Sequence, residues 1–230
     1  MAPMKKLLVV SPHLDDAVFG CGDLIAAHSG SVLVTVFAGI PERFHGLTEW
    51  DAVCGFLSAR EAVLSRRRED ETALALLAAH PVWLSFCDAQ YGAPARSIEV
   101  TRALRGVLKE TSCDTVVFPL GLFHSDHEMT HCASLALMRE GRPLQWLCYE
   151  DTFYRCIPGL VQRRIDRLAD RHRVAAPVLN SAGLTSAKPQ AVYCYASQLR
   201  ALSSAGRPGH LDALTPERYW PLNVEEAALH

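Results

Sequence analysis

A strand–helix–strand pattern occupies about the first 37 residues, and it restricts the possible folds more than any other feature of the chain. The aliphatic run at 6–11 predicts a buried strand, 16–29 predicts a helix closed by Gly30, and 31–37 (SVLVTVF) predicts a second strand. Two strands joined through a helix over so short a distance are typical of a βαβ unit. We therefore expect a parallel sheet with right-handed crossovers.

Strands and helices continue to alternate as far as about residue 150. We expect further strands at 81–86, 114–118 and 144–149, and helices at 58–79, 97–111 and 128–139. The pattern then becomes less regular, with a basic amphipathic helix at 160–171, a short strand at 174–179, a helix at 186–202 and a surface loop from 203. The long irregular stretch at 38–57 is typical of a binding wall or lid.

These elements predict one domain over residues 1–230, with a core at about 6–150 and a C-terminal elaboration at about 151–230. The fold class is α/β and Rossmann-like, with a mostly parallel sheet and helices on both faces. A hydrophobic content of 49% argues against a disordered chain, and a formal net charge of −2 offers no basic surface for nucleic acid or a membrane.

The N-terminal apolar run is too short for a secretory signal, and no stretch approaches the roughly 18 to 20 apolar residues of a membrane span. We therefore expect a cytoplasmic protein. Eight cysteines are spread along the chain without a CxxC pair, so we expect them to be reduced and mostly buried, and we do not expect a cysteine-bound zinc ion.

A first polar cluster, Ser11-Pro12-His13-Leu14-Asp15-Asp16, directly follows the first predicted strand. Ligands of open parallel sheets bind at the carboxyl ends of the strands. Two adjacent carboxylates repel each other unless a cation or hydrogen-bond donors lie between them. The alternative is a helix N-cap, in which Asp15 or Asp16 accepts backbone N–H groups and His13 is incidental. Taken alone, this cluster does not decide between the two interpretations.

A second polar cluster, His124-Ser125-Asp126-His127, follows the fourth predicted strand, and its alternative interpretation is a polar surface loop. The first and fourth strands should flank the switch point of a doubly wound sheet, so the two clusters should face each other. Two histidines and one carboxylate leave an open position on Zn²⁺. A spare carboxylate and a spare histidine could then transfer a proton and stabilise an oxyanion, which favours metal-assisted hydrolysis.

Residues 10–17 (VSPHLDDA) resemble the PHPDDE-type motif of the PIG-L/LmbE-like deacetylases, zinc-dependent enzymes that remove N-acetyl groups from amino sugars. The HSDH sequence at 124–127 is similar to the second motif of that family, HPDH or HxDH. Weaker likeness around Arg68-Glu69 and at 188–198 extends the resemblance over roughly residues 6 to 200. Leu14, Ala17 and Ser125 depart from the usual Pro, Glu and Pro, which affects the local backbone but no ligand or base.

The resemblance implies roles for eight residues. His13, Asp16 and His127 would bind zinc, and Asp15 would act as general base and later as acid. His124 would polarise the carbonyl and stabilise the oxyanion, while Asp126 would hold a histidine in position. Arg68 and Asp88 would bind sugar hydroxyls. By the same resemblance, Zn²⁺ is the expected cofactor, with Fe²⁺ or another divalent metal as an alternative.

The implied function is metal-dependent removal of an N-acetyl group from a small amino-sugar conjugate of the N-acetylglucosaminyl type. Two alternatives stay open: a non-catalytic sugar-binding protein on the same scaffold, and a non-haem iron oxygenase, which would leave Asp15 idle. We expect His131 to pack beside the site rather than to bind metal. Tyr149-Glu150-Asp151 either lines the pocket or only ends a strand, and a homo-oligomer is left open.

Overall fold

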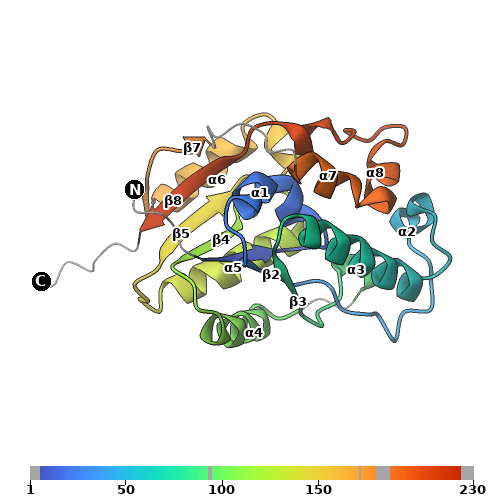
Figure 1. Cartoon of the computed structure of the whole chain (residues 1–230), viewed down its shortest axis with the longest axis horizontal. Helices are drawn as coiled ribbons and strands as arrows, with labels where there is room; N and C mark the ends of the chain where they lie inside the picture. The colour runs from blue at the N-terminus through green and yellow to red at the C-terminus, as the bar shows by residue number, and fades with distance from the viewer. Residues whose placement is uncertain (1–5, 93–94, 171, 180–186, 224–230) are drawn as a thin grey trace, which may run out of the picture.

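Five parallel strands form the part of the sheet that the sequence predicts (Figure 1). The computed structural model describes residues 6–92, 95–170, 172–179 and 187–223. The strands pair in the order β3-β2-β1-β4-β5: β1 (Leu7–Ser11), β2 (Val32–Thr35), β3 (His80–Trp83), β4 (Thr115–Pro119) and β5 (Gln145–Tyr149). The order reverses between β1 and β4, so the switch point lies where these two strands end, as expected.

Helices cover both faces of the sheet, which confirms the predicted α/β class. On one face α1 (Asp16–Ala26), α3 (Ala59–Leu76) and α7 (Ala187–Tyr193) pack over Leu7 and Val9. On the other face α4 (Ser97–Glu110), α5 (Ser125–Met138) and α6 (Leu160–Ala169) pack over Leu8 and Val10. All five residues of β1 are buried, because a parallel strand between two helical layers exposes neither face.

The C-terminal region differs from the prediction. The tail after residue 203, expected to be a surface loop, supplies β8 (Arg218–Asn223), which pairs antiparallel with β5. Two short strands, β6 (Arg173–Val174) and β7 (Val178–Leu179), pair with β8 in place of one strand at 174–179. The prediction was wrong because RYWPLN contains a proline and no aliphatic run. Its strand conformation comes from pairing with β5, which is distant in the sequence.

Several helix boundaries also differ from the prediction. The expected helix at 186–202 is two helices, α7 and α8 (Ala196–Leu202), separated at Cys194 and Tyr195. The stretch at 38–57 contains a short helix, α2 (Glu49–Cys54), capped by the Thr48 hydroxyl, which accepts from the Asp51 N–H at 3.0 Å. Helix α5 begins three residues earlier than expected, so the HSDH motif forms its N-cap and first turn. The described residues also contain the 3₁₀ turns η1 (Ala89–Tyr91), η2 (Tyr154–Cys156) and η3 (Leu211–Leu214).

The C-terminal region also completes α1, the helix that follows the first polar cluster. The backbone of α1 leaves helical geometry at Cys21. The freed N–H groups of Asp23 and Leu24 donate to the Glu217 carboxylate, at 2.8 and 3.1 Å, and Lys188 Nζ lies 2.6 Å from the same carboxylate. Because Glu217 directly precedes β8, the last strand helps to position the start of α1.

All eight cysteines are free thiols, as expected, but only Cys21, Cys54 and Cys148 are buried, so the expectation of mostly buried cysteines was wrong. Cys132 and Cys156 are exposed. Among the residues that the structure describes, no helix is both long enough and apolar enough to span a lipid bilayer.

Candidate active site

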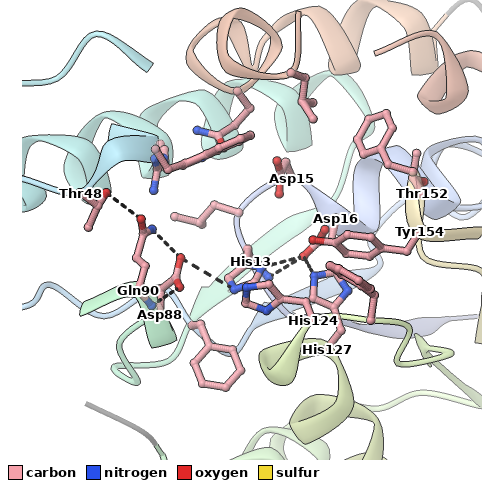
Figure 2. Close-up of a pocket in the computed structure, with 18 of the residues that line it drawn as sticks. His13, Asp15, Asp16, Thr48, Asp88, Gln90, His124, His127, Thr152 and Tyr154 are labelled. Atoms are coloured by element: carbon pink, nitrogen blue, oxygen red, sulfur yellow. Dashed lines mark hydrogen bonds and ion pairs between the residues drawn. The ribbon is translucent and has the colours of Figure 1, made fainter. Parts of the chain in front are cut away.

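A pocket of about 560 Å³ opens where β1 and β4 end (Figure 2). Its lining comes from the turn after β1, the segment around α2, helix α3, the turn at 88–91, the start of α5, residues 152–154 and α8 with the residues that follow it. Both polar clusters contribute to this lining, the first through residues 13–16 and the second through His124 and His127. The expectation that they face each other at the switch point is therefore confirmed.

The first cluster is a tight turn between β1 and α1. Ser11 Oγ donates to the His13 carbonyl at 2.6 Å and accepts from the Ala17 N–H at 3.1 Å, which fixes the turn. Asp16 Oδ2 accepts from the His13 backbone N–H at 2.9 Å and lies 3.2 Å from His13 Nδ1. Asp15 occupies the N-cap position, but its side chain makes no capping hydrogen bond. The N-cap interpretation therefore fails for Asp15, while Asp16 accepts a backbone N–H from the preceding turn and contacts the His13 ring as well.

The second cluster is the start of α5, and it contacts the first cluster directly. His13 Nε2 lies 3.0 Å from Asp126 Oδ2, which also accepts from the Ala89 N–H at 3.0 Å. His127 Nε2 lies 3.2 Å from Asp16 Oδ2. His124 is the N-cap of α5, and its Nδ1 accepts from the Asp126 N–H at 3.2 Å. The cluster is therefore not a polar surface loop.

Asp151, which the sequence left undecided, is a buried member of the site. One of its oxygens accepts from the N–H groups of Gly121 and Leu122, at 2.8 and 3.2 Å. The other lies 2.5 Å from His127 Nδ1. A carboxylate on the second ring nitrogen fixes the tautomer and orientation of a metal-binding histidine. Asp151 thus leaves His127 Nε2 facing the pocket.

The residues of the pocket fit a divalent metal ion. Asp16 Oδ2 lies between His13 Nδ1 and His127 Nε2, at 3.2 Å from each. The other ring nitrogen of each histidine is held by a separate carboxylate, Asp126 for His13 and Asp151 for His127. Two imidazoles and one carboxylate, each imidazole oriented by an outer carboxylate, form a donor set suited to Zn²⁺.

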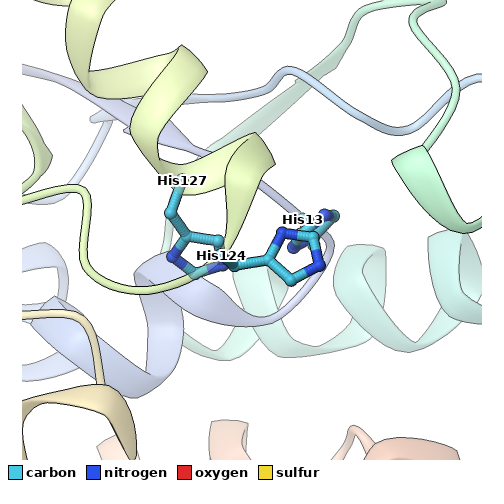
Figure 3. A group of neighbouring side chains, drawn as sticks. All are labelled: His13, His124 and His127. Carbon is cyan, nitrogen blue, oxygen red and sulfur yellow. The ribbon is translucent and has the colours of Figure 1, made fainter. Parts of the chain in front are cut away.

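Two further groups of side chains in the same pocket lie close enough to share an ion. His13, His124 and His127 form one group (Figure 3), and His13, Asp88, His124 and Asp126 form the other. In the second group Asp126 already bonds His13 Nε2 and the Ala89 N–H, which leaves it less free to bind a metal. In the first group His124 Nδ1 already accepts from a backbone N–H. In the set His13, Asp16 and His127, each histidine still has a ring nitrogen facing Asp16, and Asp16 Oδ2 accepts only one backbone N–H, that of His13.

Burial and neighbouring charges shift the pKa values of these groups in the metal-free protein. Burial and the adjacent Asp16 carboxylate raise the pKa of Asp15 well above its usual range. Burial also opposes ionisation of Asp16, yet the neighbouring His127 and His13 hold its pKa well below the usual range. Burial, aided by His13 and His127, lowers the pKa of His124. The site therefore pairs an easily protonated carboxylate with a neutral imidazole.

The two candidate sugar-binding residues differ in position. Asp88 lines the pocket, with Oδ2 3.9 Å from His13 Nε2, and accepts from the Gln90 backbone and side-chain N–H groups. Arg68 lies on the exposed side of α3, outside the pocket, so the structure contradicts its placement in the site. The residue that faces the pocket is Arg66. Two positions along a helix correspond to a rotation of about 200°, which places Arg66 and Arg68 on opposite sides.

Arg66 belongs to a buried group that sequence reasoning missed. Its Nη2 donates to Asp51 Oδ1 at 2.6 Å, and the Tyr91 hydroxyl donates to Asp51 Oδ2 at 3.0 Å. Asp51 is fully buried and Arg66 is 7% exposed. This group forms the wall of the pocket beneath α2. From the sequence, only the position of each residue around the predicted helix at 58–79 could have indicated that Arg66 faces this wall.

An aromatic pair forms part of the pocket rim. Phe123 is 67% exposed, although it is large and apolar, and its backbone has φ of +64°. A left-handed backbone is strained for such a residue and is often kept for function. The Phe123 ring packs on Tyr154 at 5.3 Å between centroids, and Tyr154 packs edge-on to His127 at 5.2 Å. The rim is therefore built directly beside the metal-binding residues.

The doubly wound sheet and the paired histidine–carboxylate clusters at its switch point define a metal-binding α/β enzyme. Comparison with known families identifies the particular family within this class. The chain belongs to the PIG-L family, because the family profile described as GlcNAc-PI de-N-acetylase matches residues 8–138, more than half of the chain. The protein is therefore an N-deacetylase of this family.

Individual relatives agree with this assignment. The chain is 28% identical over 218 residues to 2'-N-acetylparomamine deacetylase of Streptomyces fradiae, covering 84% of this chain and 73% of that protein. It resembles the crystal structure of a deacetylase triple mutant from the teicoplanin biosynthetic pathway, with 28% identity, a TM-score of 0.81 and coverage of 97% and 100%. The A40926 pseudoaglycone deacetylase gives 25% identity, a TM-score of 0.75 and coverage of 94% and 96%. These relatives favour neither a sugar-binding protein nor an iron oxygenase.

Proposed function

We propose that the protein is a Zn²⁺-dependent hydrolase that removes the N-acetyl group from a small amino-sugar conjugate, releasing acetate and a free amine. One observation carries the proposal. Asp15 makes no side-chain hydrogen bond within the described residues and lies in the pocket beside a metal-donor set (Figure 2). A carboxylate left free next to two histidines and a second carboxylate is suited to proton transfer.

His13, Asp16 and His127 would hold the metal through Nδ1, a carboxylate oxygen and Nε2. When bound, Zn²⁺ supplies a Lewis acid that polarises the amide carbonyl and lowers the pKa of water. Asp126 and Asp151 hold the outer nitrogens of the two histidines, at 3.0 and 2.5 Å. These outer carboxylates make the imidazoles better ligands and fix their direction.

Asp15 would act first as base and then as acid. It accepts a proton from the attacking water and later donates it to the nitrogen of the departing amine. A leaving amine needs that proton, because its unprotonated form is a poor leaving group. In the metal-free protein, burial and the Asp16 carboxylate raise the pKa of the Asp15 carboxyl, and a carboxyl that holds a proton more readily is also the stronger base.

His124 would stabilise the oxyanion that forms when water adds to the carbonyl. Its Nδ1 accepts from the Asp126 backbone N–H at 3.2 Å, so the neutral ring carries its proton on Nε2. The lowered pKa of His124 favours this neutral form. His124 Nε2–H is therefore available as a donor in the pocket, which is the role required of an oxyanion-stabilising group.

The pocket wall and rim would bind the rest of the substrate. Asp88 and Gln90 offer carboxylate and amide groups to sugar hydroxyls, and Arg66 offers a guanidinium from α3. The exposed ring of Phe123, packed on Tyr154, offers an apolar surface to the group attached to the amino sugar. Stacking on an aromatic face needs no particular hydrogen-bond pattern, so this rim could accept a ring of the conjugate.

The proposal is tested by acetate release from a panel of N-acetylated amino-sugar conjugates, with wild-type protein and Asp15→Asn compared at equal zinc content. We expect wild-type protein to release acetate, and Asp15→Asn to lose about a hundredfold to ten-thousandfold in kcat while keeping its zinc. Arg68→Gln, on the exposed side of α3, is the matched control and should retain activity. Absence of acetate from every substrate, or full activity in Asp15→Asn, would refute the proposal.

A further inference from the structure

Two features of the sequence play no part in the proposed reaction: the basic helix α6 and His131, one turn beyond the second motif. The structure brings them together at a second cavity, of about 400 Å³, between α5 and α6. No residue that lines this cavity also lines the active-site pocket. Its polar lining consists of Arg139, Arg164, Arg167, Asp170, His131 and His172.

The cavity carries an excess of positive charge. Three arginines face a single carboxylate, Asp170. Within the described part of the chain, no carboxylate lies within ion-pair distance of Arg139 or Arg167. Arg139 Nη2 instead lies 3.3 Å from His172 Nε2. Two exposed guanidinium groups therefore reach one concave surface that holds a single carboxylate, and this excess of positive charge suits an anion.

Arg164 has a different role in the same wall. Its guanidinium donates to the Gly121 carbonyl and lies 2.9 Å from Glu128. Gly121 in turn donates its N–H to Asp151, which holds His127. Arg164 therefore supports the loop of the active site, and its substitution would disturb both pockets. Within the described residues, neither Arg139 nor Arg167 contacts the loop of the active site.

His131 supplies an acceptor to the cavity. It is 1% exposed, and its Nδ1 donates to the Pro119 carbonyl at 2.9 Å. Burial lowers the pKa of His131 to about 4, so the ring is neutral and Nε2 carries a lone pair. Among the described residues this buried Nε2 has no hydrogen-bond partner. A buried acceptor without a partner is unfavourable and marks a place where a polar partner is missing.

We propose that the cavity between α5 and α6 binds a hydrogen phosphate group, either inorganic phosphate or the phosphoryl group of a small metabolite. The guanidinium groups of Arg139 and Arg167 match the geometry and charge of phosphate oxygens. The remaining hydroxyl hydrogen of the phosphate satisfies the acceptor of His131. Sulfate carries no hydrogen at neutral pH, so it satisfies the arginines but leaves His131 Nε2 without a partner.

The test is a phosphate titration of the zinc-loaded protein at constant ionic strength, followed by the NMR signals of isotope-labelled histidines. The His131 signal is assigned with His131→Gln. We expect a saturable shift of His131, affinity about tenfold weaker in Arg139→Gln and in Arg167→Gln, and affinity about tenfold weaker for sulfate. Arg163→Gln is the matched control, because Arg163 lies on α6 outside the cavity and its substitution should leave affinity unchanged.

The affinities for inorganic phosphate and for glucose 6-phosphate are then compared. The compound that binds more tightly shows whether the ligand is free phosphate or the phosphoryl group of a metabolite. Three results would overturn the proposal. The first is the absence of a saturable His131 shift, including the case in which phosphate shifts only His127 by binding at the metal. The second is equal weakening in Arg163→Gln and Arg167→Gln. The third is sulfate binding as tightly as phosphate.

Discussion

Asp70 gives a prediction that links one buried group to the pH dependence of stability. Asp70 lies on α3, is 1% exposed, and accepts from Trp83 Nε1 at 2.7 Å and from the Tyr195 hydroxyl at 2.8 Å. Burial raises its pKa from the usual 3.8 to about 6, although both hydrogen bonds oppose the change. The folded protein thus holds the Asp70 proton more tightly than the unfolded chain does.

The sign and size of the effect follow from this difference. Below pH 3.8 the carboxyl is protonated in both states. As the pH rises towards 6, the unfolded chain loses the proton first, so the free energy of unfolding falls. A rise in pKa from 3.8 to about 6 corresponds to about 3 kcal/mol, all of which is lost above pH 6. An amide in place of the Asp70 carboxyl has no proton to lose.

We therefore expect the stability of Asp70→Asn relative to wild-type protein to rise by about 3 kcal/mol as the pH increases from 4 to 7. The assay is urea denaturation of both metal-free proteins across this range. Every other titrating group is common to both proteins and cancels in the difference, and any fixed cost of replacing an acceptor by an amide shifts the difference equally at every pH, so the change between pH 4 and pH 7 reports Asp70. A difference in unfolding free energy that stays constant with pH would refute the reasoning.

Three further predictions test the site and its surroundings. Asp151→Asn should weaken zinc binding about 10- to 100-fold in a chelator competition, and unchanged affinity would show that Asp151 does not orient His127. Arg66→Gln should destabilise the protein by about 3 to 5 kcal/mol, because it leaves the buried Asp51 charge unpaired. Arg68→Gln, the control, should change stability by less than about 0.5 kcal/mol. Equal losses of stability in urea denaturation would contradict this prediction. Phe123→Ala should raise KM about 2- to 12-fold for a conjugate with a ring beyond the amino sugar but not for N-acetylglucosamine, and a uniform rise would count against the aromatic rim.

The sequence predicted the parallel part of the fold and the meeting of the two clusters. Each cluster directly follows a strand, and the rule for switch points relates the two strands without any knowledge of packing. His13, Asp15, Asp16, His124 and His127 could therefore be placed in one pocket. Their roles stay predictions, because roles depend on chemistry that sequence position does not determine.

What the sequence did not predict depends on contacts between distant parts of the chain. Residues 218–223 form a strand because they pair with β5, and their own composition does not predict a strand. From the sequence, Arg68 was predicted as a pocket residue instead of Arg66, because three arginines are consecutive at 66–68. Only the orientation of each residue around the axis of α3 shows which one faces the pocket. From the sequence alone, Asp151 could simply follow the end of a strand. Its contact with His127 depends on β4 and β5 being neighbours in the sheet. The left-handed backbone of Phe123 has no sequence signature, since the residue is not glycine.

The central claim is that His13, Asp16 and His127 hold a metal ion on which deacetylation depends. The most direct measurement is acetate release from an N-acetylated amino-sugar conjugate while metal-free protein is titrated with Zn²⁺, in wild-type protein and in His127→Ala. We predict no release without metal, a linear rise that ends at one equivalent in wild-type protein, and no comparable rise in His127→Ala. Acetate release that survives complete metal removal, or a normal titration in His127→Ala, would contradict the account.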